Sequence, residues 1–204
     1  VIGPLTIAGI SADEKTLEKF KEIGVKDSKL LSIRRIFQLE RIIKENTEYK
    51  VVIKSAKEID DRFAIQKNLN YFELDEMAEI ANSLKGDRVT IDSPSANIKK
   101  VENYLSQKIV GKTVIARNYA DRDYTEVGAA SILAKAQRER EVEKIKKIFE
   151  YDFGSGYPSD PKTKLFLKII KYNNKINEYP YSDYIRKSWL TIKNLNNINL
   201  NDFL

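Results

Sequence analysis

Two side chains that carry much enzyme chemistry are missing from this sequence, which contains neither cysteine nor histidine. Without cysteine there is no disulfide framework and no thiolate metal site. Without histidine, imidazole-based catalytic triads and histidine zinc sites are excluded. Any acid–base or metal chemistry must therefore use carboxylates, lysine, tyrosine or water.

Long apolar segments are absent as well. No apolar run approaches the roughly 18 residues that cross a bilayer, and the chain does not open on the basic and apolar regions of a signal peptide. We therefore expect no membrane partner and a cytoplasmic setting.

Charge, in contrast, is abundant. Lys and Arg number 36 against 30 Asp and Glu, which gives a formal net charge of +6. This excess fits a polyanionic partner such as nucleic acid, whose affinity arises mainly from phosphate neutralisation. Taken alone, however, the charge is explained better by an ordinary lysine-rich surface.

Predicted strands and helices alternate along the 204 residues. Apolar runs predict strands that begin near Leu5 and at residues 49–55, 87–91 and 112–117. Amphipathic periodicity and capping residues predict helices at residues 16–23, 33–46, 70–84, 97–107, 125–150 and 161–172. This alternation predicts an α/β fold with at least one parallel pair of strands.

Asp92 and Asp121 form the most informative pair. Each follows a short strand directly or within a few residues, and one predicted helix lies between the two strands. A strand–helix–strand unit of this length joins parallel strands by a right-handed crossover. If the strands are neighbours, their carboxyl ends lie about 5 Å apart. Both carboxylates would then share the end of the sheet where ligands bind in α/β folds.

Two carboxylates that close repel each other unless a cation lies between them. Mg²⁺ or Mn²⁺, which prefer oxygen ligands, are the natural occupants and can assist phosphodiester cleavage. A purely structural alternative is equally open at this point. In it, Asp92 opens an Asx turn before Pro94, and Asp121 caps the long helix that follows.

The segment at residues 154–161, Gly-Ser-Gly-Tyr-Pro-Ser-Asp-Pro, interrupts the helical pattern. Its glycines permit unusual backbone angles, and Asp160 followed by Pro161 is typical of a helix N-cap with proline at the first helical position. Tyr157 lies between a glycine and a proline, so its ring could stand exposed and stack on a sugar or base. The commoner fate of such a loop is a connector with a buried tyrosine.

Basic residues give weaker signals. Lys26, Ser28 and Lys29 lie on a predicted turn that could hold a phosphate by charge and hydrogen bonds, although an ordinary solvated turn is the commoner case. Lys135, Arg138 and Arg140 form a basic stripe on the long predicted helix, and such a stripe is likewise more often a solvated helix face.

Taken together, these motifs resemble archaeal-type ribonuclease HII. The matching segments, in order, are Gly24-Val25-Lys26-Asp27-Ser28-Lys29, the strand-end Asp92, Ala120-Asp121, Ala129-Ala130-Ser131-Ile132-Leu133-Ala134-Lys135, and residues 153–161. The resemblance covers nearly the whole chain, and the last two segments are its most specific parts.

The resemblance implies a ribonuclease H-like fold, a mixed five-stranded sheet flanked by helices. Residues 1–150 would form the catalytic domain, and residues 151–204 a small helical region. It also implies that the protein cleaves the RNA strand of RNA–DNA hybrids, and ribonucleotides embedded in duplex DNA, with Mg²⁺ or Mn²⁺ held by four acidic residues. Asp92 and Asp121 match the third and fourth of these.

By the same resemblance, Tyr157 matches a tyrosine that stacks near the RNA–DNA junction. The expected partner is a hybrid duplex or ribonucleotide-containing DNA, and the complete protein is expected to be a monomer. The other residues assigned to nucleic-acid binding are Lys26, Ser28, Lys29, Gly154, Ser155, Lys135 and Arg138.

The sequence departs from the family in several places. Members open with a strand and Asp-Glu-Ala-Gly-Arg-Gly immediately before a segment like Val1–Leu5, and this motif, with two of the four acids, does not occur here. We therefore expect a piece of a longer or split enzyme, neither active nor stably folded by itself. Asn118 and Tyr119 replace a His and a Lys. Glu126 takes a normally apolar place, where a stray surface charge is favoured over a substitute acid.

Three functional hypotheses remain. The leading one is a metal-dependent endoribonuclease that acts on hybrid duplexes. The alternative is a catalytically incomplete, hybrid-binding fragment of the same fold, which rests on the missing acids. Another nuclease or a transposase of the same fold is disfavoured by the segment at residues 154–161.

Overall fold

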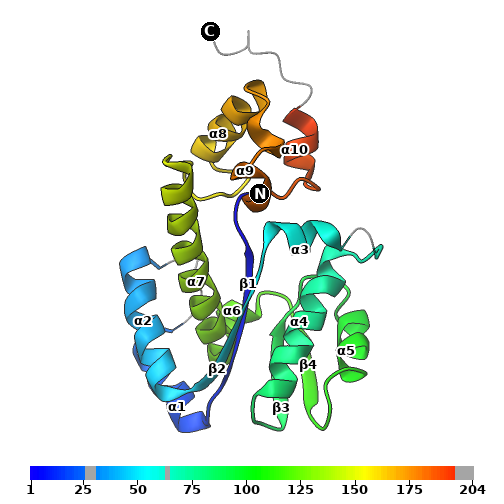
Figure 1. Cartoon of the computed structure of the whole chain (residues 1–204). Helices are drawn as coiled ribbons and strands as arrows, with labels where there is room; N and C mark the ends of the chain where they lie inside the picture. Colours follow the sequence, from blue (N-terminus) through cyan, green and yellow to red (C-terminus); the bar gives the residue numbers. More distant parts are fainter. Residues whose placement is uncertain (26–30, 63–64, 196–204) are drawn as a thin grey trace. The chain divides into compact units, whose positions relative to one another are not determined.

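The computed structural model describes residues 1–25, 31–62 and 65–195. These residues separate into two compact units, each of which is described by itself (Figure 1). Unit 1 comprises Val1–Leu5, Lys54–Gln66 and Arg138–Leu204, and unit 2 comprises Thr6–Ile53 and Lys67–Gln137. The predicted division into residues 1–150 and 151–204 stays a prediction, because compactness alone does not define a domain.

Four strands are present in the described part of the chain, and they form two separate pairs. β1 (Leu5–Ser11) pairs with β2 (Glu48–Lys54), and β3 (Arg88–Asp92) pairs with β4 (Thr113–Arg117). The β3–β4 pair is parallel, with α5 (Ile98–Ser106) in the connection, so the prediction of a parallel pair is confirmed.

The prediction of one mixed five-stranded sheet is not met by the described residues, which form two two-stranded sheets. Within the described residues, neither strand of the β1–β2 pair is a hydrogen-bonded neighbour of β3 or β4. Since hydrogen-bonded neighbours define a sheet, β1–β2 and β3–β4 are separate sheets here.

The helices begin and end close to the predicted positions, because their capping residues are legible in the sequence. Ser32 accepts a hydrogen bond from the backbone N–H of Arg35 and starts α2, and Asp13 does the same for Thr16 at the start of α1. The helices in unit 2 are α1 (Glu14–Glu22), α2 (Ile33–Asn46), α4 (Leu69–Ser83), α5 and α6 (Ala120–Asp123).

The long helix α7 (Thr125–Phe149) contributes residues 125–137 to unit 2 and residues 138–149 to unit 1. The other helices of unit 1 are α3 (Ala56–Asp61), α8 (Pro161–Tyr172), the 3₁₀ helix η2 (Lys175–Asn177), α9 (Tyr181–Tyr184) and α10 (Leu190–Asn194). No helix in the described part of the chain is long and apolar enough to cross a bilayer.

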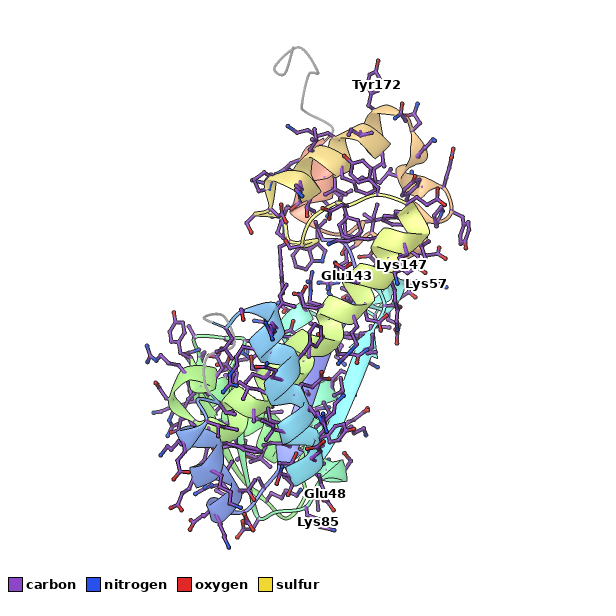
Figure 2. All side chains as sticks on the ribbon, turned by 90° about the vertical axis from the view of Figure 1, so that its left-hand side faces the viewer. Glu48, Lys57, Lys85, Glu143, Lys147 and Tyr172 are labelled. Carbon is purple, nitrogen blue, oxygen red and sulfur yellow. The ribbon has the colours of Figure 1, made fainter. Side chains whose placement is uncertain are left out.

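Unit 2 has two hydrophobic clusters, one for each pair of strands. In the first, side chains of α2 pack against the Ala-rich start of α7, with Ile36, Leu39 and Ile132 fully buried. In the second, α4 and α5 pack against β3 and β4. Lys85, which follows α4, forms an exposed ion pair with Glu48 of β2, with 2.6 Å between Nζ and Oε1 (Figure 2).

Unit 1 is built around aromatic rings. Phe149 at the end of α7, Phe153 and Phe166 of α8 lie with ring centroids 5.5–5.7 Å apart, a separation at which aromatic pairs attract. Asp160 caps α8 by accepting from the backbone N–H of Lys162, and Pro161 takes the first turn, as predicted. These contacts hold the loop at residues 153–161 against the helical core.

Candidate functional site

Asp92 and the segment that contains Asp121 lie at the same end of the β3–β4 pair. Asp92 ends β3 and pairs in register with Arg117, the last residue of β4. Asp92 Oδ1 accepts a hydrogen bond at 3.0 Å from the backbone N–H of Ala120, the residue before Asp121. The strand-end geometry expected from the sequence is therefore present, and one carboxylate contacts the backbone beside the other.

The purely structural alternative differs from the structure in the place of Asp121. The turn after β3 is held by Ser93, whose hydroxyl donates to the carbonyl of Ser95 and accepts from its N–H. Asp121 lies inside α6 instead of at the start of α7, which begins at Thr125. The hydroxyl of Ser93 thus takes part in this turn, and Asp121 lies in the short helix that precedes α7.

Burial adds to the electrostatic character of this strand end. Asp121 is only 4% exposed, and Asp92 is half-buried. Removing carboxylates from water disfavours their charged form unless a cation or hydrogen bonds compensate. The described residues contain no group of three or more His, Cys, Asp or Glu side chains that could hold a metal ion. Mg²⁺, however, commonly takes one or two protein carboxylates and completes its shell with water and substrate phosphates, so the pair fits such an ion.

Glu126 also reaches this region. Its Oε1 accepts a hydrogen bond at 2.9 Å from the hydroxyl of Thr90, and the side chain is half-buried. Thr90 precedes Asp92 by two residues on β3, so both side chains point to the same face. The hydrogen bond from a strand hydroxyl thus holds the Glu126 carboxylate near this strand, and the interpretation of Glu126 as a stray charge stays a prediction.

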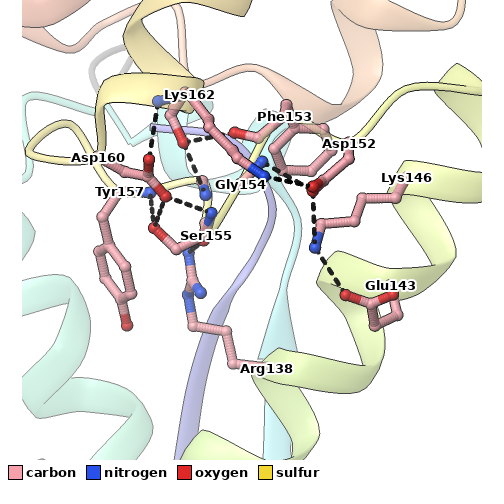
Figure 3. Close-up of polar contacts among 12 residues, drawn as sticks. Arg138, Glu143, Lys146, Asp152, Phe153, Gly154, Ser155, Tyr157, Asp160 and Lys162 are labelled. Carbon is pink, nitrogen blue, oxygen red and sulfur yellow. Dashed lines mark hydrogen bonds and ion pairs between the residues drawn. The ribbon is translucent and has the colours of Figure 1, made fainter.

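In unit 1, the loop that presents Tyr157 is held by the Asp160 carboxylate (Figure 3). Asp160 Oδ2 accepts from the backbone N–H of Ser155 at 2.6 Å and from its hydroxyl at 2.7 Å, while Oδ1 accepts from the N–H of Lys162 at 2.9 Å. The hydrogen bonds from Ser155 lower the pKa of Asp160 below its usual value. The carboxylate therefore stays charged and ties both ends of the loop together.

A second carboxylate, Asp152, anchors the start of the same loop. It accepts from the N–H of Gly154 at 3.1 Å and forms ion pairs with Lys162 at 2.9 Å and Lys146 at 3.1 Å. The Lys162 hydrogen bond, followed by those from Gly154 and Lys146, holds the pKa of Asp152 well below its usual range. Figure 3 shows this network beside the loop.

Beneath the loop, the buried hydroxyl of Thr163 joins two backbone groups. Its Oγ1 accepts from the N–H of Gly156 at 3.0 Å and donates to the carbonyl of Phe153 at 2.8 Å, and the residue is 0% exposed. The roles of Thr163 and Asp152 were not predictable from the sequence, since a threonine in a first helical turn and an aspartate after a helix give no distinctive signal.

Tyr157 itself is 46% exposed, so the alternative of a connector with a buried tyrosine does not hold. The guanidinium carbon of Arg138 lies 3.9 Å from the centroid of its ring, and Arg138 Nη2 donates to the carbonyl of Ser155 at 3.0 Å. An exposed ring on a hydrogen-bonded loop is an arrangement that can stack on a base or sugar.

The other predicted binding residues fall into three groups. Gly154 and Ser155 belong to the loop just described. Lys135 is half-buried on the unit 2 part of α7, whereas Arg138 is only 7% exposed, in unit 1, and is not part of a solvated helix face. The predicted phosphate-binding turn, Lys26, Ser28 and Lys29, lies outside the described residues.

Comparison with known proteins matches the chain to one family. A family model described as Ribonuclease HII matches residues 1–192. A ribonuclease HII of Methanococcus maripaludis is 40% identical over 201 residues, which cover 96% of this chain and 82% of the relative.

Solved structures agree on the fold. The chain superposes on the RNase HII of the structure "PCNA:RNase HII complex from Archaeoglobus fulgidus" with a TM-score of 0.86 and 40% identity, covering 100% of this chain and 94% of that one. It also resembles Bst-RNase HIII in complex with Mn²⁺, with a TM-score of 0.75 over 98% of this chain and 66% of that one, but at 18% identity this likeness shows the fold alone.

The fold thus places the chain among the ribonuclease H-like α/β nucleases. Within that class, the chain belongs to the ribonuclease HII family of endoribonucleases, which act on RNA–DNA hybrids.

Proposed function

We propose that Asp92 and Asp121 hold Mg²⁺ or Mn²⁺ and that the protein, as a monomer, uses this site to cleave RNA–DNA hybrids and ribonucleotides embedded in duplex DNA. The observation that carries the proposal is the hydrogen bond from the Ala120 N–H to the Asp92 carboxylate, because it ties the two aspartate segments together at one strand end. A divalent ion held there supplies water activation and stabilisation of the leaving oxygen.

Hydrogen bonding and burial set the orientation and the surroundings of the two carboxylates. The Ala120 N–H fixes the orientation of the Asp92 carboxylate, and the burial of Asp121 keeps water from screening its charge. Since Mg²⁺ takes only one or two protein carboxylates when substrate phosphates complete its shell, metal binding and duplex binding should strengthen each other.

Duplex binding is assigned to the loop of unit 1 and to the basic residues. Tyr157 would stack on a sugar or base near the junction, with Gly154 and Ser155 in backbone contact. Lys26, Ser28, Lys29 and Lys135 would contact phosphates, which position a duplex without reading its sequence. The exposure of Tyr157 on a loop tied by Asp160 supports this role.

A hybrid-binding protein without cleavage is the second candidate. It is favoured by one observation, that no group of three or more potential metal ligands occurs among the residues described. Both candidates predict duplex binding, and only the first predicts metal-dependent cleavage.

The test measures cleavage and binding separately. Cleavage of a hybrid with a labelled RNA strand is followed in Mg²⁺ and in Mn²⁺, and binding is followed by fluorescence anisotropy in Ca²⁺. D92N and D121N should each lower cleavage by at least about 100-fold, since losing even a partner of a metal ligand costs about 10- to 100-fold, while binding stays within a few-fold. D123N is the matched control, because Asp123 lies on the same short helix, is exposed and pairs with Arg122.

The outcomes separate the candidates. The nuclease is supported if the unaltered chain and D123N cleave the hybrid and D92N and D121N do not. Binding without cleavage in either metal selects the second candidate. Cleavage that survives in both D92N and D121N overturns the assignment of the site.

A further inference from the structure

Arg138 contacts both the ring of Tyr157 and the backbone of the loop that carries it. Its guanidinium lies 3.9 Å from the ring centroid of Tyr157, and its Nη2 donates to the carbonyl of Ser155, two residues earlier. The side chain is only 7% exposed, whereas the ring above it is 46% exposed. The arginine thus contacts the loop and leaves part of the tyrosine exposed to solvent; Figure 3 shows the two side chains beside each other.

The arrangement is built for stacking more than for hydrogen bonding. Arg138 Nη1 is buried and has no hydrogen-bond partner among the described residues. A buried, incompletely hydrogen-bonded cation is costly unless another interaction compensates, and cation–π attraction is strongest for a desolvated guanidinium against an aromatic ring. The cation–π contact with the ring of Tyr157 therefore helps to hold the Arg138 guanidinium in place, and the guanidinium likewise helps to hold the ring.

The backbone of the loop also allows a close approach to the Arg138 guanidinium. Gly156 has a φ of +75°, and a Cβ there would lie 3.3 Å from Arg138 Nη2 and 2.7 Å from the carbonyl oxygen of Ile2. Only glycine adopts this conformation at no steric cost. The loop can thus lie directly on the guanidinium, with Tyr157 as the next residue.

We propose that Arg138 is a positioning residue that fixes the pose of the Tyr157 ring and thereby raises the preference of the protein for RNA–DNA hybrid over all-DNA duplex. This inference rests on the proposed function, in which Tyr157 contacts the duplex. A ring that is already oriented loses less rotational freedom when it binds, so its contact contributes more to affinity. Arg138, in this account, contacts no phosphate itself.

Arg186 provides a matched control in the same unit. It is also 7% exposed, its guanidinium carbon lies 5.0 Å from the ring of Trp189, and its Nε donates to the carbonyl of Gly3 at 3.0 Å. The two arginines therefore share burial, a ring contact and a carbonyl acceptor. They differ in that only Arg138 contacts Tyr157.

The experiment is a double-mutant cycle on binding, which requires no cleavage. The full chain and its R138M, Y157A and R138M/Y157A variants are titrated into a labelled RNA–DNA hybrid and into the all-DNA duplex of the same sequence. R138M should weaken hybrid binding on the order of 5-fold, the scale of one cation–π contact, with less effect on DNA. In the Y157A background, R138M should add nothing.

R186M and R138K complete the design. R186M should lower the melting temperature yet leave the ratio of hybrid to DNA affinity unchanged. R138K keeps the charge but not the planar stack, so it should lose part of the preference. If R138M does not fold, R138K takes its place in the cycle.

The results distinguish two kinds of failure. Equal losses from the Arg138 variant with and without Tyr157 would overturn the inference and indicate a direct duplex contact. A Y157A variant that binds hybrid as well as the unaltered chain would remove the proposed role of Tyr157 instead. Coupled losses confined to the hybrid, absent in R186M, support the inference.

Discussion

The most stringent test of the Tyr157 loop is the substitution G156A. Gly156 has a positive φ of +75°, and an added Cβ would lie 2.7 Å from the backbone carbonyl oxygen of Ile2, which is too close for any real Cβ. The loop must shift, and two hydrogen bonds are at risk. They run from the Ile2 N–H to the Gly156 carbonyl at 3.0 Å and from the Gly156 N–H to Thr163 at 3.0 Å.

The expected cost follows from these two effects. The left-handed conformation costs an L-residue roughly 1–2 kcal/mol, and losing one buried hydrogen bond adds about 1–3 kcal/mol. G156A should therefore destabilise unit 1 by about 2–5 kcal/mol. This is a large fraction of the roughly 5–15 kcal/mol stability of a typical domain.

The substitution G3A is a control that separates the cost of the backbone conformation from the cost of the steric clash. Gly3 is in the same unit and has a φ of +89°, but the nearest atom to an added Cβ is the terminal methyl of Ile145 at 3.3 Å, which can move. G3A should cost only the roughly 1–2 kcal/mol of the backbone conformation. Urea unfolding is followed by the fluorescence of Trp189, the only tryptophan, which packs against the core of unit 1. Equal losses in G156A and G3A would refute this account of the loop.

Three further substitutions test separate contacts. T163V keeps the shape of Thr163 but leaves two buried backbone groups unpaired, so urea unfolding should show a loss of about 2–5 kcal/mol, with T163S much milder. The folded-state pKa of Asp152 is lowered, chiefly by Lys162. Its contribution to stability is therefore complete above the unfolded-state pKa near 3.9, and it disappears as the pH falls below that value toward the folded-state pKa. D152N should flatten this dependence of the unfolding free energy on acid pH. An unchanged pH dependence in D152N would contradict the ion pair. T90V removes the hydrogen bond to Glu126 and should cost about 1–2 kcal/mol in thermal unfolding, a cost that vanishes in the E126V background.

Much of the fold was predictable because its signals are local. Asp160 acts as the helix cap that its position indicated, and the parallel β3–β4 pair follows from two short apolar runs joined by one helix. Asp92 was predictable for the same reason. A residue that ends a strand before a crossover must lie at the carboxyl edge of the sheet.

What the sequence did not reveal depends on contacts between distant residues. Arg138 has the pattern of a solvated helix face, and only the folded loop, nearly twenty positions later in the sequence, shows that it is buried against Tyr157. The hydrogen bond of Glu126 could not be predicted because its partner Thr90 lies 36 positions away. The short helices α3 and α6 were missed since they have too few residues to show a helical period.

Metal binding by Asp92 and Asp121 is the central claim, and calorimetric titration of Mn²⁺ tests it most directly. The titration is made with and without a hybrid whose RNA strand resists cleavage. We expect the hybrid to strengthen Mn²⁺ binding to the unaltered chain and to D123N, and we expect D92N and D121N to abolish this strengthening. Mn²⁺ binding that is equal in all four proteins would contradict it.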